Sequence, residues 1–491
     1  MGATERLDFS EFSWTAMESR ERPLHVATLL IYSLPDDADK DFLKNLVADL
    51  RDSTEFVEPF NKRYLAPTLT RPYPVWERDF DLDMEYHVRH LALPHPGGER
   101  ELGVLIARLH SNPMDFSRPL WEYHVIEGLE NNRFAVYFKM HHALVDGIAG
   151  VRMLQRSMST DPEATSPPAL WSAPVPEEIL DSKRAVDRFR RAIAGARKTL
   201  SSAGQVTRQL AGAIKAAGDD NDPFVAPFQA PTTILNGRIK GQRRFATQQY
   251  SFARIRRLSK AADCTVNDIV LAISSGALRR FLREQNALPG RPLIAGIPVS
   301  LRTKDDQGAG SAVSFMLANL GTNIADPARR LEAICKSTKR AKSMTEGLSR
   351  DEIENFTALF LAPSALQTAL NLEGRTAPIF NVTISNVPGP VETLYFRRAK
   401  LEAMYPVSAV IHGQALNITC YSYAGSLTFG FAGCRDSVPS LQRIAVYAGD
   451  ALEELESVYL TEQTHVATQG SRKRRVGAAP KTSTAAKAAN K

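Results

Sequence analysis

Apolar side chains follow two different spacings in the first half of the chain. A continuous run of aliphatic and β-branched residues at 24–34 predicts a buried strand. Apolar residues three and four positions apart predict amphipathic helices elsewhere. Two further apolar runs, between Pro119 and Met140, are separated by an Asn-rich segment and predict a β-hairpin. The helices are expected at 38–51, 99–110 and 148–158.

The second half mixes the two spacings in the same way. A long helix is expected to begin after Thr265, which is a favourable N-terminal capping residue, and to end near Arg283. Strands and helices are interspersed in both halves, with hairpins, so we expect an α/β (α+β) protein of two lobes. Other strands are expected at 243–252, 291–302, 379–390 and, as hairpins of an antiparallel sheet, within 400–433; other helices are expected shortly after 252 and at 326–346, 351–372 and 438–458.

The segment between the halves differs in composition from both. Five prolines in residues 161–178 predict an extended linker. Residues 183–216 hold nine Lys and Arg against one acid and have helically spaced apolar positions, which predicts a basic amphipathic helix. That helix is either a connector across the body or a membrane-surface element. The expected organisation is an N-terminal lobe (1–160), a linker region (161–240), a C-terminal lobe (241–460) and a tail (461–491).

Composition and charge narrow the class of protein. The chain has 491 residues, 43% hydrophobic and 23% charged, which is ordinary for a globular protein and excludes a wholly disordered one. The net charge is +7, but residues 471–491 alone hold seven Lys and Arg and no acid. The rest of the chain then has 54 basic and 54 acidic residues. A nucleic-acid groove would place its basic excess inside the fold, so the charge argues against nucleic acid and predicts a basic, disordered tail.

The cysteines and the hydropathy of the chain indicate the cellular compartment in which the protein is expected. The four cysteines, Cys264, Cys335, Cys420 and Cys434, show no metal-like spacing and predict reduced thiols in a cytoplasmic protein. The first residues contain acids and no apolar core, so we expect no signal peptide. Because no stretch reaches about 18 uninterrupted apolar residues, we expect no membrane-spanning helix. Any membrane contact is then expected to be peripheral.

The segment from His141 to Gly147, HHALVDG, is the strongest chemical signal in the sequence. In the simplest interpretation the two histidines end a strand and Asp146-Gly147 makes a turn. A metal site is disfavoured, because adjacent histidines on an extended chain point to opposite faces. In the third interpretation one histidine is a general base, since imidazole titrates near neutrality. Asp146 would then hold the loop by pairing with an arginine, and Gly147 would permit a tight turn.

This segment resembles the HHxxxDG active-site signature of the coenzyme A-dependent acyltransferase superfamily, which includes chloramphenicol acetyltransferases and peptide-synthetase condensation domains. Three further pieces follow in an order similar to that of the bacterial wax ester synthase/diacylglycerol acyltransferase family. They are Pro119-Leu120-Trp121, Val266-Asn267-Asp268 and the run from Ser385 to Pro390. The resemblance covers about residues 5–460 and leaves out the basic tail.

The resemblance implies a fold and a reaction. The fold would be two chloramphenicol acetyltransferase-like lobes with mixed sheets and an active-site tunnel between them. The reaction would move a long-chain acyl group from acyl-CoA to a fatty alcohol, giving a wax ester, or to diacylglycerol, giving triacylglycerol. His142 would be the general base, with acyl-CoA as co-substrate, no bound cofactor and no metal.

The same resemblance assigns expectations to the other site residues. His141 would shape the turn or hydrogen-bond within the pocket wall. Asp146 would be structural and paired with an arginine, for which Arg302 is the candidate. Asn267 would donate to the oxyanion, or else would cap the following helix together with Asp268. The Pro119–Trp121 and Ser385–Pro390 segments are expected to be structural.

Insoluble products imply an enzyme at the inner membrane or at a lipid droplet. The basic helix and the tail could bind anionic headgroups there. Two alternatives remain at this stage. One is an acyltransferase of the same fold with a different acceptor, and the other is a non-catalytic protein that binds a lipid surface.

Overall fold

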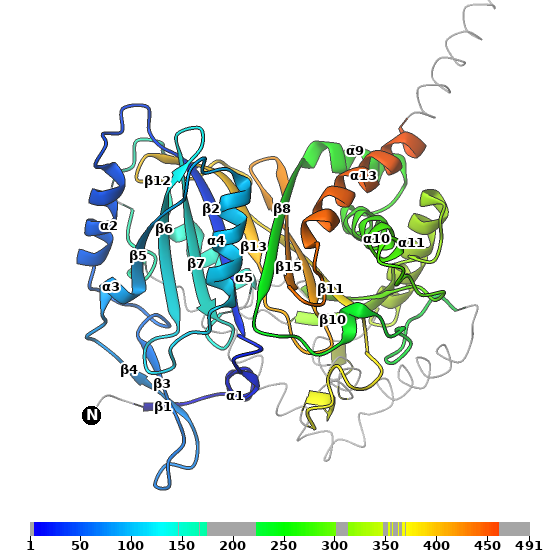
Figure 1. Cartoon of the computed structure of the whole chain (residues 1–491), viewed down its shortest axis with the longest axis horizontal. Helices are drawn as coiled ribbons and strands as arrows, with labels where there is room; N and C mark the ends of the chain where they lie inside the picture. The colour runs from blue at the N-terminus through cyan, green and yellow to red at the C-terminus, as the bar shows by residue number, and fades with distance from the viewer. Residues whose placement is uncertain are drawn as a thin grey trace, which may run out of the picture.

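The computed structural model describes residues 4–145, 147–165, 167–173, 222–300, 313–346 and 371–460, with scattered residues between 352 and 370. Two six-stranded sheets lie side by side, one in each lobe, and helices pack against them (Figure 1). Each sheet combines parallel and antiparallel pairs. The expected α/β architecture of two lobes with mixed sheets is therefore confirmed.

The N-terminal sheet has the strand order β12-β13-β2-β7-β6-β5. Its centre is the predicted hairpin of β6 (Trp121–Leu129) and β7 (Arg133–His141). Asn131 and Asn132 make the turn with φ values of 62° and 54°, the conformation that tight hairpins require and that Asn tolerates. On its other edge, β7 pairs with β2 (His25–Ser33), the buried strand expected at 24–34.

Further elements surround this sheet. The helix α4 (Glu99–Ser111) buries Leu102, Leu105 and Ile106 against one face, as its apolar spacing predicted. The predicted helices at 38–51 and 148–158 are α2 (Phe42–Asp52) and α5 (Gly147–Arg156). Elements that the pattern did not reveal are α1 (Phe9–Met17), α3 (Met84–His87), β5 (Val88–Ala92), and the small sheet of β1 (Thr4–Arg6), β4 (Val75–Arg78) and β3 (Lys62–Leu65).

The C-terminal sheet has the order β10-β9-β11-β14-β15-β8. The long helix α10 (Val266–Glu284) lies in the middle of the helical layer, in contact with α11 and α13. This lobe contains β8 (Arg243–Ser251), α9 (Phe252–Ala261), β9 (Ile294–Ser300), β10 (Val313–Asn319), α11 (Pro327–Ser343), β11 (Val382–Pro388), β14 (Leu416–Tyr423), β15 (Ser426–Cys434) and α13 (Leu441–Tyr459), preceded by the short helix η1 (Ile234–Asn236).

Two strands from the second half of the chain belong to the N-terminal sheet. β13 (Ala399–Val407) pairs with β2, and β12 (Tyr395–Phe396) pairs with β13. Figure 1 shows β13 beside β2 in the N-terminal sheet. The 400–433 run is therefore not one antiparallel meander, since only β14 and β15 form a hairpin. The local sequence pattern predicted the strand β13 correctly, but it carried no information that β13 pairs with β2.

The linker expectation was also partly wrong. Trp171 is completely buried, donates from Nε1 to the Ser53 carbonyl over 2.8 Å and stacks on Trp121 with ring centroids 5.1 Å apart. The described residues 167–173 of the proline-rich segment therefore pack into the N-terminal core. The predicted basic helix at 183–216, the predicted helix at 351–372 in large part, and the tail at 461–491 lie outside the described residues.

The two sheets meet where β13 crosses β15. A Cβ added to Gly430 on β15 would lie 1.8 Å from the carbonyl oxygen of Pro406 on β13. That distance is far below van der Waals contact. Gly430 thus permits the close approach by which the crossing strand locks the lobes together.

We expect Gly430→Ala to destabilise the protein by about 1–3 kcal/mol or more, because β13 and β15 would have to separate. Gly290→Ala is the matched control, since no atom lies within 4 Å of its added Cβ among the described residues. Urea unfolding of both variants measures the difference. Equal stability of the two variants would contradict the close approach.

Candidate active site

The two histidines lie where β7 ends and its chain turns toward α5. The His141 amide donates to the Leu120 carbonyl over 3.0 Å, and the His142 amide donates to the Leu24 carbonyl over 2.9 Å. These acceptors precede β6 and β2, the two strands that flank β7. The Leu144 amide closes the turn onto the His141 carbonyl over 2.9 Å. The turn is therefore tied to both neighbouring strands.

His141 is buried and its ring has fixed partners. Its Nδ1 accepts the Ala143 amide over 3.1 Å, so the proton of the neutral ring is on Nε2. Nε2 lies 3.5 Å from Oε2 of Glu18. Phe116 packs edge-on against the ring, with centroids 5.4 Å apart. These contacts favour the turn-shaping alternative for this residue.

His142 is half-buried and has a different environment. Its ring stacks on Trp14, with centroids 4.1 Å apart and planes 10° apart. Stacking occupies the face of an imidazole and leaves its two nitrogens at the ring edge. His142 therefore has a restrained ring plane and nitrogens that are not consumed by the stacking contact.

Trp14 and Glu18 were both missed in the sequence. Trp14 lies on α1, and Glu18 is the residue at which that helix ends. Oε2 of Glu18 accepts the Leu24 amide over 2.6 Å, so the carboxylate ties the end of α1 to the start of β2. The four-residue spacing of Trp14 and Glu18, which puts both on one side of a helix, was the available signal.

A layer of buried charge lies below His141 on the same face of the sheet. The fully buried Lys139 is 3.0 Å from Oε2 of Glu122, and Nε2 of His124 lies 3.0 Å from the same oxygen. Burial alone would raise the pKa of Glu122, but the His124 hydrogen bond and the Lys139 charge hold it near 2. The carboxylate therefore stays ionised beneath the turn.

Two further buried histidines complete this layer. His25 faces His141 across the β2–β7 pair and its Nε2 donates to the His110 carbonyl over 3.0 Å. His110 donates from Nε2 to the Ser408 carbonyl over 3.1 Å and accepts the Tyr137 hydroxyl at Nδ1 over 2.9 Å. Burial lowers the pKa of His110 to about 3, so the ring is neutral. His110 thereby joins α4 to the segment that leaves β13.

The candidate residues of the C-terminal lobe lie at the start of α10. Thr265 caps α10 and Asp268 completes the capping box: the Thr265 hydroxyl accepts the Asp268 amide over 3.1 Å, and Asp268 accepts the Thr265 amide over 3.0 Å. Asp268 also accepts the Thr338 hydroxyl over 2.7 Å. The capping alternative therefore holds for Asp268. Asn267 is half-buried beside it, and no hydrogen bond between described residues joins it to either histidine.

The structure bears less directly on three other predicted residues, Asp146, Arg302 and Gly147. Asp146 and Arg302 lie outside the described residues, so their pairing stays a prediction. Gly147 begins α5, but its φ lies outside the left-handed region, and no described atom lies within 4 Å of an added Cβ. Gly147 thus stands at the start of a helix, and its role in permitting a tight turn stays a prediction.

The Pro119–Trp121 and Ser385–Pro390 segments are structural, as expected. Trp121 is completely buried and donates from Nε1 to the Phe60 carbonyl over 2.8 Å. In the second segment, a Cβ added to Gly389 would lie 2.3 Å from the Ser422 carbonyl oxygen. Each segment thus fixes the end of a strand by close packing.

The family follows from sequence and structure comparison. Residues 9–270 match the wax ester synthase/diacylglycerol acyltransferase catalytic domain, and residues 309–456 match the WS/DGAT C-terminal domain. The chain belongs to the wax ester synthase/diacylglycerol acyltransferase family. The resemblance inferred from HHALVDG and the three flanking segments is confirmed.

Individual relatives extend over nearly the whole chain. A candidate diacylglycerol O-acyltransferase of Mycobacterium tuberculosis H37Rv is 43% identical and covers 92% of this chain and 97% of its own. The O-acyltransferase WSD of Acinetobacter baylyi is 38% identical with the same coverage. The wax ester synthase/diacylglycerol acyltransferase of Marinobacter aquaeolei VT8 superposes with a TM-score of 0.75 at 36% identity, covering 93% of this chain and 99% of its own.

A more distant structure shares only the fold. The first condensation domain of the calcium-dependent antibiotic synthetase superposes with a TM-score of 0.57 at 16% identity, covering 92% of this chain and 95% of its own. The two-lobed architecture implied by HHxxxDG is thus the one observed.

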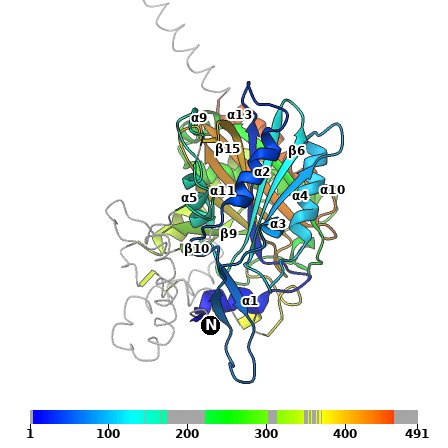
Figure 2. The same cartoon turned by 90° about the vertical axis from the view of Figure 1, so that its left-hand side faces the viewer.

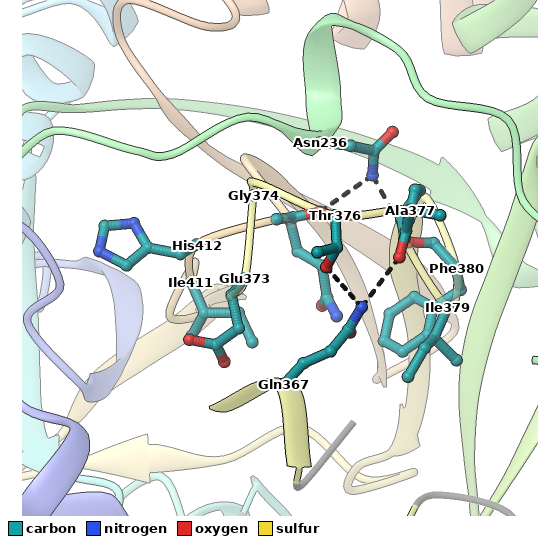
Figure 3. A pocket seen from close by; sticks show the side chains of 13 residues that line it. Asn236, Gln367, Glu373, Gly374, Thr376, Ala377, Ile379, Phe380, Ile411 and His412 are labelled. Carbon is teal, nitrogen blue, oxygen red and sulfur yellow. Dashed lines mark hydrogen bonds between the residues drawn. The ribbon is translucent and has the colours of Figure 1, made fainter. Parts of the chain in front are cut away.

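A small pocket is lined by residues of the second half of the chain, among them Gln367, Thr376 and His412 (Figure 3). The Gln367 amide donates there to the Thr376 hydroxyl over 2.8 Å and to the Ala377 carbonyl over 2.9 Å. The His412 ring points away from Gln367, and burial together with the neighbouring Arg238 lowers its pKa to about 4. The Gln367 bonds thus tie the wall of this pocket to the Thr376–Ala377 segment.

The described residues contain neither a metal-binding cluster nor a membrane-spanning helix. Within them, no group of three or more His, Cys, Asp or Glu side chains is placed to hold a metal ion. Across the same residues, every helix is too short or too polar to cross a bilayer.

Stability should fall in acid partly through His110. Its pKa is near 3 in the fold against an ordinary value of 6.5, so between these values the unfolded chain binds a proton that the folded chain excludes. Stability therefore decreases as pH drops below about 6.5. From pH 7 to pH 5 we expect His110→Gln to lose less stability than the unsubstituted protein, by on the order of 2 kcal/mol.

Urea unfolding at the two pH values measures this effect. The exposed His95 provides the control, since His95→Gln removes an imidazole without removing a buried one. Identical pH dependence of the His110→Gln variant and the unsubstituted protein would contradict the assignment.

Proposed function

We propose that the protein transfers a long-chain acyl group from acyl-CoA to the hydroxyl of a fatty alcohol or of diacylglycerol, with His142 as general base. The products are a wax ester or triacylglycerol. Membership of the family and the names of the relatives support the reaction class. The observation that carries the residue assignment is the restrained His142 ring, stacked on Trp14 in a turn that both neighbouring strands hold.

The reaction needs one proton to move twice. A ring nitrogen of His142 removes the hydroxyl proton as that oxygen attacks the thioester carbonyl. The tetrahedral intermediate then expels the coenzyme A sulfur as the carbon–sulfur bond breaks, and the imidazolium returns the proton to the thiolate. A positioned base of this kind contributes about 10²–10⁴-fold. No acyl-enzyme, bound cofactor or metal takes part in this scheme.

The other residues are assigned supporting roles. His141 shapes the turn through its bond from Ala143. Asp146 holds the same turn from its far end, with Arg302 as its proposed partner. Asn267 is proposed to donate from its side-chain amide to the oxyanion, which requires substrate to lie between the two lobes.

The substrates set the character of the site and the location. Long apolar chains require a tunnel between the lobes that excludes water from the thioester. Because the products are insoluble, we place the enzyme at the cytoplasmic side of the inner membrane or at a lipid droplet. The predicted basic helix and tail would bind anionic headgroups there.

An acceptor panel tests the function. The full chain is incubated with labelled palmitoyl-CoA and, in turn, hexadecanol, dipalmitoylglycerol and a long-chain amine, and the neutral lipids are separated by chromatography. We expect ester from at least one hydroxyl acceptor and a loss of about 10²–10⁴-fold in His142→Ala. His95→Gln should retain full activity. Absence of ester from every alcohol and diacylglycerol would refute the proposal, and an active His142→Ala would refute the residue.

Substitutions of Asn267 and of Asp268 should change different measured properties of the protein. Asn267→Ala is expected to lower kcat about 10²-fold with little change in melting temperature, because one oxyanion donor is lost. Asp268→Ala is expected to lower the melting temperature, because the α10 cap and the bond from Thr338 are lost. An Asn267→Ala variant with unchanged kcat would leave Asn267 a structural residue.

A further inference from the structure

We propose that α1 is a positioning element for the catalytic turn, in which Trp14 fixes the plane of the His142 ring and the Glu18 carboxylate favours its protonated form during the reaction. The inference rests on the proposed function. Neither residue touches the reacting atoms in this proposal, so both are positioning residues.

The start of α1 is built to hold its register. Asp8 accepts the Glu11 amide over 2.8 Å, and Glu11 accepts the Asp8 amide over 2.9 Å, which forms a capping box. Trp14 follows one turn later and Glu18 one turn after that. The two side chains therefore reach the same side of the helix, toward the turn after β7.

Trp14 acts on the ring of His142. The nearly parallel stack, at 10° and 4.1 Å, restricts rotation of the imidazole about its side-chain bonds. The face of an indole also attracts a cation, so the contact becomes more favourable when His142 is protonated. A base that must accept and return one proton benefits from both effects.

Glu18 acts through the backbone and through its charge. Its Oε2 accepts the Leu24 amide over 2.6 Å, while the Leu24 carbonyl accepts the His142 amide over 2.9 Å. The peptide groups of Leu24, just before β2, thus link the Glu18 carboxylate to the backbone amide of His142. The Glu18 side chain is only 11% exposed, so solvent screens its charge weakly.

The charges that face Glu18 come from two strands. On β7 they are His141, 3.5 Å away, and the buried Lys139; on β8 it is Arg243. The Glu18 carboxylate therefore lies beside the histidine pair and faces two basic side chains.

Both lobes hold the α1 segment in place. Arg22 donates from its guanidinium to the Met17 carbonyl over 2.7 Å and to the Glu373 carboxylate over 2.8 Å. Arg243 of the C-terminal lobe donates to the Glu21 carbonyl over 3.0 Å. Figures 1 and 2 show α1 at the lower end of the molecule, next to the β3–β4 sheet. The position of Trp14 and Glu18 therefore depends on the assembled two-lobed fold.

The charge is tested with Glu18→Gln, which is isosteric and keeps an oxygen acceptor for Leu24. Removing the charge destabilises the imidazolium, so the pKa of the catalytic base should fall. We expect the acid limb of the kcat–pH profile to move about half a unit to one unit lower, kcat to fall about tenfold and KM to change little. The control Glu21→Gln removes an exposed charge nearby and should leave the profile unchanged.

The outcomes distinguish a failure of the Glu18 role from a failure of the proposed function. If Glu18→Gln lowers kcat without moving the acid limb, or leaves both unchanged, the positioning role of the charge is refuted. If the unsubstituted protein makes no ester from any acceptor, the proposed function has failed independently of Glu18.

The stack is tested with a pair of substitutions at Trp14. Trp14→Phe keeps an aromatic face and should retain kcat within about threefold, whereas Trp14→Ala should lose tenfold or more at an unchanged melting temperature. Phe12→Ala, an exposed aromatic on the same helix, is the control and should behave as the unsubstituted protein. A fully active Trp14→Ala, or a Trp14→Phe no better than Trp14→Ala, would refute the role of the stack.

Discussion

The hydrogen bonds that hold the end of β7 between its two neighbours determine how the candidate site is built. The His141 amide is bonded to the segment before β6 and the His142 amide to the segment before β2. The strand can therefore neither slide nor peel away without breaking both contacts. A one-residue shift of register would exchange the faces on which the two histidines lie, because side chains alternate along a strand. The difference between a buried His141 and a half-buried His142 follows from this constraint.

The interlocked lobes give the turn its surroundings. β13 crosses from the second half of the chain into the N-terminal sheet, and the α1 segment is bonded to Glu373 and Arg243 of the other lobe. Neither lobe can move far without disturbing the residues that surround the histidines. A reaction that joins two separate substrates needs such a fixed relation, because alignment of the reacting groups supplies much of the rate.

The charged layer beneath the turn is costly to bury and is correspondingly well paired. Glu122 is shared by Lys139 and His124, and His110 uses both ring nitrogens. Removing one member of such a network leaves another charge or polar group without its partner, which is more destabilising than never burying the pair. The layer therefore supports the strand end that carries the two histidines, and makes this part of the lobe sensitive to acid.

The sequence by itself determined most of the helices and strands, the family, and the HHALVDG segment that carries the two histidines. Apolar spacing located the β6–β7 hairpin, β2, α4 and α10, because these signals are local and each element buries one continuous apolar face. It did not reveal that β13 joins β2, that Trp171 is core, or that Trp14 and Glu18 adjoin the histidines. Those facts are contacts between residues far apart in the sequence. Only the packing of the whole chain decides them, because the local pattern around each residue is compatible with many different partners.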